Sequence, residues 1–130
     1  MPCSITIKGT DFRVREYMAE TKLSNIHFWC KGDLTQGGKR LYKSGLGIQV
    51  SAADLANLNA QIRGTLLYLT KNQSELKKLA TYRGVDEAYL SFAMEQEDEI
   101  ALFVYFPADL VKLAGDIGLG IHICQFRCSE

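Results

Sequence analysis

Short segments in which apolar and polar residues alternate are the feature that most limits how this chain can fold. They cover residues 4–8, 26–31, 88–94, 100–106 and 121–126, and residues 48–50 form a shorter run of the same kind. Because successive side chains of a strand point to opposite faces of its sheet, each run predicts a strand with one apolar face. Only residues 95–99 separate the runs 88–94 and 100–106, which predicts a hairpin.

Other segments repeat apolar residues at the spacing of a helix. The first covers residues 12–22, and the second runs from Ser51 to Asn72, after which a further helical segment continues to Gly84. The last begins at Pro107, a residue favoured at the first position of a helix, and ends before Gly118. The predicted order is β-α-β-β-α-β-β-α-β. We expect residues 1–130 to form a single α+β domain, with one mixed or mostly antiparallel sheet and its helices on one face.

The charge balance argues against a nucleic-acid partner. The chain has 15 basic and 15 acidic residues and a formal net charge of zero, whereas proteins that bind polyanions usually carry a basic excess. No run approaches the ~18 consecutive apolar residues of a membrane-spanning helix. The first residues also lack the basic start and apolar core of a signal peptide. We therefore expect a cytoplasmic protein with no membrane partner.

The cysteines Cys3, Cys30, Cys124 and Cys128 allow three interpretations. An even number suits a disulfide framework, but such frameworks belong to secreted proteins. A shared metal would need Cys124 and Cys128, which on one strand would lie ~13 Å apart unless the chain turns. We favour free thiols, with Cys30 and Cys124 packed as small hydrophobic residues, and we expect no metal ion or cofactor.

No segment carries a recognisable catalytic motif. His27 and His122 are the only histidines, and no Ser, Cys or carboxylate stands in a nucleophile motif. We therefore expect a protein that is not an enzyme. The glycine-rich segment 32–47 departs from a phosphate-binding P-loop, because its lysine comes one position late and Arg40 replaces the required Ser or Thr. We expect a flexible basic loop there; as a ligand site it would use Lys31, Lys39, Arg40 and Lys43.

The strand residues that alternate with the aliphatic ones are aromatic, hydroxyl and imidazole groups. This second set comprises Thr6, Lys8, His27, Trp29, Tyr89, Ser91, Phe103, Tyr105, His122, Cys124 and Phe126. Aromatic rings with polar groups are typical of surfaces that meet a protein partner. The candidate partner-binding residues are therefore Trp29, Tyr89, Phe103, Tyr105, Phe126, His27 and His122. Two alternatives stay open: loops such as residues 32–47 or a second sheet layer cover this face, or the face stacks single-stranded nucleic acid.

Charge is unevenly distributed along the chain. Residues 1–65 carry 9 basic and 5 acidic groups, whereas residues 66–130 carry 6 basic and 10 acidic groups. Four acids, Glu95, Glu97, Asp98 and Glu99, fall within residues 95–99. The run lacks the alternation and glycine of a calcium loop. It is either a solvated hairpin tip or a second partner-binding surface for a protein with a basic groove.

Two segments resemble a known family. The first consists of Ile-Thr-Ile-Lys-Gly-Thr-Asp-Phe at residues 5–12 and Phe-Trp-Cys-Lys-Gly-Asp at residues 28–33, and the second extends from Tyr105 to Ile123. Both are similar to small uncharacterised bacterial proteins with a domain of unknown function, near the family numbered 4279. The family offers no activity or catalytic residues to transfer. Since many small bacterial proteins of this sort are encoded near polymorphic toxins, the resemblance implies by analogy an immunity-type protein.

We therefore expect a non-enzymatic protein-binding module, either an immunity-type inhibitor of a bacterial toxin or a self-associating domain that forms a homodimer. The alternative from a different class is a small-molecule or nucleotide-binding protein that uses the basic loop 32–47.

Overall fold

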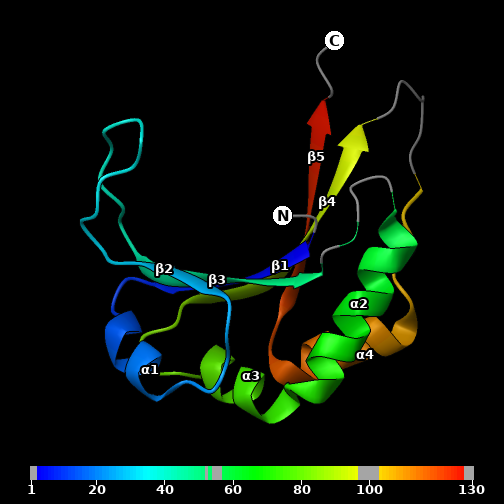
Figure 1. The fold of residues 1–130 in the computed structure, drawn as a ribbon, viewed down its shortest axis with the longest axis horizontal. Coiled ribbons are helices and arrows are strands. Elements are labelled where there is room, and N and C mark those ends of the chain that lie inside the picture. The colour runs from blue at the N-terminus through cyan, green and yellow to red at the C-terminus, as the bar shows by residue number, and fades with distance from the viewer. Residues whose placement is uncertain (1–2, 52, 54–56, 97–102, 128–130) are drawn as a thin grey trace.

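A five-stranded sheet forms one layer of the molecule (Figure 1). The computed structural model describes residues 3–51, 53, 57–96 and 103–127, and for residues 96, 126 and 127 it describes only the backbone. The strands are β1 (Cys3–Gly9), β2 (Ile26–Trp29), β3 (Ser44–Ser51), β4 (Glu87–Gln96) and β5 (Gly120–Arg127). Their order across the sheet is β2-β3-β1-β4-β5, so that β1 lies at its centre.

The sheet is mixed. β1 pairs antiparallel with β3 and with β4, β2 pairs antiparallel with β3, and β4 pairs parallel with β5. The parallel pair requires a crossover, which is supplied by the helix between the two strands. That helix ends at Gly118, whose φ of 104° lies in the left-handed region favoured by glycine, and its N–H bonds to Ala114.

The helices are α1 (Val14–Glu20), α2 (Leu58–Lys71), α3 (Gln73–Ala80) and α4 (Ala108–Ile117). All of them lie on one side of the sheet (Figure 1). The α+β class, the single mixed sheet and the helices on one face are therefore confirmed, and the order of elements is consistent with the expected one. The boundary between α2 and α3 falls at Asn72, as the sequence predicts.

Burial in β1 alternates as its sequence predicts. Cys3, Ile5 and Ile7 are almost fully buried against the helices, whereas Ser4 and Thr6 are half-buried on the opposite face. Buried residues of the helices complete the core with the inward residues of β3 and β4. They include Tyr17, Ile62, Leu69, Leu76, Leu79, Leu110 and Ile117. The apolar stripes of the helices thus meet the apolar face of the sheet.

One predicted strand differs from the structure. Residues 103–106, the described part of the expected strand 100–106, have no regular secondary structure. The edge of β4 that a hairpin partner would use is occupied by β5. Phe106 instead packs on Phe92 in the core, with ring centroids 4.9 Å apart. The alternating pattern therefore reflects one anchoring ring and exposed neighbours, and not a strand.

A second difference concerns the glycine-rich segment 32–47. Its last residues, from Ser44 to Gly47, belong to β3, which the sequence placed only at residues 48–50. The side chains that a strand normally packs are missing at Gly45 and Gly47, so the alternation there was hidden. The remaining residues form a projecting hairpin.

Candidate functional site

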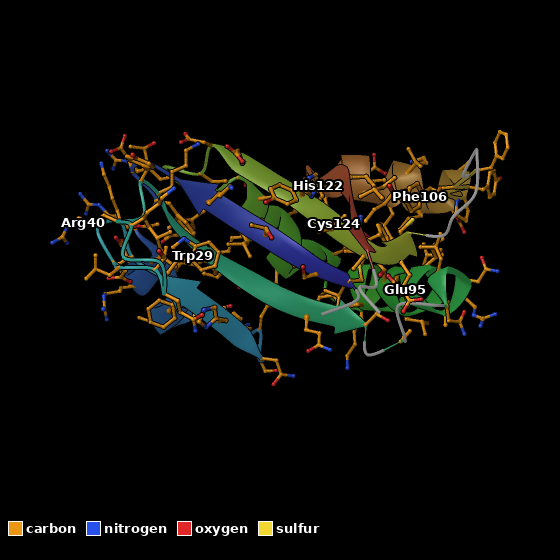
Figure 2. All side chains as sticks on the ribbon, turned by 90° about the horizontal axis from the view of Figure 1, so that it is seen from above. Trp29, Arg40, Glu95, Phe106, His122 and Cys124 are labelled. Carbon is orange, nitrogen blue, oxygen red and sulfur yellow. The ribbon has the colours of Figure 1, made fainter. Side chains whose placement is uncertain are left out.

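The face of the sheet opposite the helices is the candidate site, and Figure 2 views the molecule from this side. The register of the strand pairs places residues from all five strands on it. They are Ser4, Thr6, Lys8, His27, Trp29, Gly45, Gly47, Gln49, Glu87, Tyr89, Ser91, His122 and Cys124. We call this set the open face. The open-face residues that the sequence analysis had predicted lie close together, because cross-strand partners point to the same face of a sheet.

Trp29 is the largest side chain of the open face. Its indole lies over Gly45 on the neighbouring strand: a Cβ added to Gly45 would come 2.6 Å from Cζ2 of Trp29. The indole Nε1 donates a hydrogen bond of 3.1 Å to the backbone carbonyl oxygen of Lys43. The ring of His27 lies 6.1 Å from that of Trp29, measured between centroids. Trp29 is therefore held flat on the sheet, with a polar partner at its edge.

Charged groups on and beside the open face form ion pairs: Lys8 and Glu87 belong to the face, and Lys43 and Asp86 lie just before β3 and β4. The ammonium group of Lys43 lies 3.0 Å from Glu87 and 3.5 Å from Asp86, and that of Lys8 lies 3.5 Å from Glu87. The hydrogen bond from Lys43 lowers the pKa of Glu87, and the backbone N–H of Thr10 lowers the pKa of Asp86. Hydrogen bonding to Glu87 raises the pKa of Lys43. Two lysines matched by two carboxylates leave no basic excess for a phosphate backbone.

A second aromatic group lies on the other side of this ion-pair cluster. The rings of Tyr89 and His122 meet edge to face, with centroids 5.2 Å apart, and the ammonium group of Lys8 lies 5.8 Å above the Tyr89 ring. His122 is exposed, and Tyr89 is half-buried. Ala93, which pairs with Cys124, is buried, so less of the open face is accessible toward the C-terminal ends of β4 and β5. The uncharged middle of the face consists of hydroxyl groups, glycines and one amide.

Residues 30–43 form a projecting hairpin, which we call the arm. Backbone hydrogen bonds join Gly32 to Leu41 and Thr35 to Lys39 across it. The arm and the ends of β4 and β5 project on the same side of the sheet, away from the helices (Figure 1). The arm lies at one end of the molecule, whereas the ends of β4 and β5 lie nearer its middle, with α2 and α4 beyond them (Figure 1). His27 and Gln49 remain exposed, so the arm does not cover the open face, contrary to one alternative drawn from the sequence.

The basic residues proposed as a ligand site have different surroundings. Lys31, Lys39 and Arg40 are exposed on the arm, and Arg40 donates a hydrogen bond of 3.0 Å to the carbonyl oxygen of Gly32. Lys43 instead belongs to the ion-pair cluster with Asp86 and Glu87. The arm therefore presents dispersed cations at its surface.

Several predicted partner-binding residues lie elsewhere. Phe103 and Tyr105 are 94% and 77% exposed in the segment before α4, outside the sheet, because the strand predicted to carry them does not form. Glu95 is exposed near the end of β4, whereas Glu97, Asp98 and Glu99 lie outside the described residues. The backbone of Phe126 is in β5, but its side chain is not among those described.

The open face also contains residues that the sequence analysis did not select. Ser4 follows directly from the alternation of β1, which would have placed it beside Thr6. Gln49 and the two glycines of β3 require the register, since a glycine-rich segment gives no alternating signal. Asp86, which lies beside the open face just before β4, was also missed, because no periodic pattern marks it as a partner of Lys43.

The cysteines and the helices add limited information. Cys3, Cys30 and Cys124 are free thiols, and Cys128 lies outside the described residues. Within the described part of the chain, no three His, Cys, Asp or Glu residues are grouped so that they could hold a metal ion. None of the described helices has the length and apolar character needed to cross a membrane.

Surface hollows occur away from the open face. One of about 330 Å³ lies beside α1 and is lined by residues that include Arg13, Arg15, Cys30 and Ser44. Its two guanidinium groups are engaged: Arg13 lies 3.8 Å from Glu16, and Arg15 lies over the ring of Phe28. This hollow gathers no nucleophile with an adjacent base.

Comparison with known proteins identifies the chain at the level of a family. A family model described as "Domain of unknown function (DUF4279)" matches residues 1–126. No curated protein and no solved structure matches the chain.

Proposed function

The chain belongs to the DUF4279 family, and we propose that it is a non-enzymatic protein-binding module that holds its partner on the open face of the sheet. The observation that carries the proposal is the composition of this helix-free face. Its Lys8 and the neighbouring Lys43 are paired with carboxylates, Trp29 and Tyr89 lie near these paired charges, and the rest of β1 and β3 on this face contributes only hydroxyl groups, glycines and one amide. Protein interfaces are similarly rich in aromatic residues and poor in unpaired charge at their core.

The orientation of the aromatic groups supports binding over a purely structural role. Trp29 is half-buried, and its N–H is already bonded to Lys43. A partner can therefore cover the ring without breaking that hydrogen bond. Rigid aromatic groups lose little conformational entropy on binding, which makes them frequent energetic centres of interfaces.

A protein partner fits this surface better than a nucleic acid or a small molecule. A surface that binds single-stranded nucleic acid would need cations that remain available for its phosphates. Lys8 and Lys43 are instead paired with Asp86 and Glu87. The alternative of ligand binding by the arm has weaker support, because its cations are spread over an exposed hairpin.

Site-specific photo-crosslinking in the cells that make the protein tests the proposal. A benzophenone amino acid replaces His122 or Gln49, which are exposed on the open face, or Leu67, which is exposed on α2. We expect a defined protein adduct from the first two positions and none from Leu67. Adducts of equal yield from all three positions, or from Leu67 alone, would overturn the proposal. The mass of the adduct distinguishes a foreign protein, such as a toxin, from a second copy of the chain.

A further inference from the structure

We propose that the outer edge of β5 binds an extended segment of the partner protein as a sixth strand of the sheet. This inference rests on the proposed function, that the chain binds a protein, and names the part of the partner that is recognised. The segment is uncharged, has the ~6 residues of an ordinary strand, and carries an apolar side chain at every second position.

β5 lies at the border of the sheet and is paired on one side. Among the described strands it pairs with β4, over all eight of its residues from Gly120 to Arg127. Alternate residues of a strand direct their backbone N–H and C=O groups to opposite sides, so every second residue of β5 directs both groups away from β4. The outer edge of β5 therefore presents hydrogen-bond donors and acceptors at the spacing of another strand.

The sequence of β5 lacks the features that usually prevent a further strand from joining an edge. Exposed edges are commonly short, interrupted by proline or a bulge, or lined with lysine. Residues 120–127 contain neither proline nor lysine, and Arg127 is their only basic or acidic residue. Their register with β4 continues without a shift, whereas β2, at the other border of the sheet, has only four residues. Of the two borders, β5 thus offers the longer and less protected edge.

The apolar core is incompletely covered at β5. Phe92 of β4 is fully buried, whereas its partner Ile123 is 42% exposed. In the same way Leu90 is fully buried and its partner Ile121 is half-buried. Paired residues point to the same face, so both isoleucines lie on the side of the helices. A strand beside β5 would place side chains next to them and remove apolar surface from water, which is why the segment is apolar at alternate positions.

The ends of β4 and β5 give a second reason for an added strand. The described pairing of β1 with β4 ends where Cys3 meets Phe92, and residues 93–96 and 124–127 continue beyond it as a parallel pair (Figure 1). Two strands alone form a weak unit, and parallel pairs are less stable than antiparallel ones. A strand along β5 would convert this pair into a three-stranded unit.

The edge is continuous with the open face, which favours a segment of the same partner. His122 belongs to β5, and its side chain is exposed on the open face. With strands ~4.8 Å apart and a rise of ~3.3 Å per residue, a sheet of these dimensions has a footprint on the order of 500 Å². A stable interface takes ~800 Å² from each partner. A strand along β5 adds to the area that the flat face provides.

Photo-crosslinking in the cells that make the protein tests the inference. A benzophenone amino acid replaces Gln125, exposed on β5, or Gln49, exposed on β3 within the open face. Each is placed in the unmodified chain, in an Ile123→Lys variant, and in a Leu67→Lys control on α2. Mass spectrometry identifies the partner peptide in each adduct. Hydrogen exchange compares the backbone amides of residues 120–127 in the free chain and in the purified Gln49 adduct.

We expect both positions to give an adduct with the same protein, and the peptide attached through Gln125 to be apolar at alternate positions. The amides of β5 should exchange at least about tenfold more slowly in the Gln49 adduct, because a new strand protects them. Ile123→Lys should reduce the Gln125 adduct at least about tenfold, since a charge on an edge strand opposes pairing, whereas Leu67→Lys should not. Circular dichroism verifies that the variants are folded, and the exchange measurement needs neither lysine variant.

Two results would overturn the inference. A Gln49 adduct in which the amides of β5 exchange as fast as in the free chain would show that the partner adds no strand, and the proposed function would stand. The lack of an adduct from both Gln49 and Gln125 would overturn the inference together with the proposed function.

Discussion

The indole of Trp29 lies directly over Gly45, so closely that no side chain fits between them. Gly45 stands opposite Trp29 in the β2–β3 pair and opposite Lys8 in the β1–β3 pair. Glycine at this position lets the large ring lie flat on the sheet, where its N–H reaches the carbonyl of Lys43. The ring position thus depends on a residue that contributes no side chain of its own.

Gly45→Ala is expected to displace the indole and destabilise the fold. The new Cβ would lie 2.6 Å from Trp29 and 2.8 Å from the carbonyl oxygen of Ile7, and crowding of this kind costs ~1–3 kcal/mol. Gly47→Ala is the matched control, since its Cβ would be 3.9 Å from the nearest atom, the carbonyl oxygen of Ile5. Urea unfolding and tryptophan fluorescence measure both effects. Equal losses for the two variants would contradict the packing described for Trp29.

Tyr17→Phe is expected to lower the free energy of unfolding by ~1–2 kcal/mol, because it removes one partner of a partly buried hydrogen bond. The Tyr17 hydroxyl donates to Glu75 at 2.9 Å and accepts from Thr21 at 3.0 Å, which ties α1 to α3. Tyr42→Phe, at a residue 86% exposed, is the control and should change little. A double-mutant cycle with Glu75→Gln should show coupling, and additive effects would argue against this contact.

Cys3 should make stability depend on alkaline pH. Burial raises the pKa of its thiol to about 11, from a reference value of 9.0. The thiol ionises at a lower pH in the unfolded chain than in the folded protein. The stability contributed by the buried, protonated thiol is therefore fully present below pH ~8, is ~1.4 kcal/mol smaller at pH 10, and is lost as pH rises through 11. Urea unfolding under reducing conditions, compared with Cys3→Ala, isolates this group. A constant difference between the two proteins from pH 7.5 to 10 would contradict it.

Lys43→Gln should raise the pKa of Glu87 toward its ordinary value. The hydrogen bond from Lys43 is the main cause of the lowered pKa, with Lys8 adding a smaller effect. The stability that ionised Glu87 contributes to the fold is present above the ordinary carboxyl pKa, and it is lost as pH falls through the lowered pKa of Glu87. Carboxyl titration by NMR measures the pKa of Glu87 directly. Lys112→Gln, which removes the partner of Asp116 on α4, is the control and should leave Glu87 unchanged.

The alternating pattern predicted which face of the sheet most strand residues occupy, but it did not predict which strands lie side by side. In β1 the alternation of Ile5, Thr6 and Ile7 gives both faces correctly, because burial on one side is a local property. The pairing of β4 with β5 instead depends on a crossover through α4, which no local pattern encodes. The segment before α4 was therefore assigned to a hairpin, and Phe103 and Tyr105 to the sheet.

The arrangement within the candidate site was still less accessible from sequence. Trp29, Tyr89 and His122 were selected because they alternate with aliphatic residues, and the register places them on one face. The contact of Trp29 with Gly45 arises from strand pairing between segments separated by the arm. The pairing of Lys43 with Glu87 joins residues 44 positions apart. Such contacts follow from topology, whereas composition and periodicity reveal only which groups are available.

The most direct test of the central claim is native mass spectrometry of the tagged protein, purified gently from the cells that make it. Three forms are compared: the unmodified chain, a Trp29→Ala, Tyr89→Ala variant, and a Leu67→Ala variant altered on α2. The account predicts a protein complex heavier than the 14.5 kDa chain for the first and third forms. The open-face variant, folded by circular dichroism, should be the bare chain. A complex that survives in that variant, or a bare 14.5 kDa monomer in all three forms, would contradict the claim that the open face binds a protein.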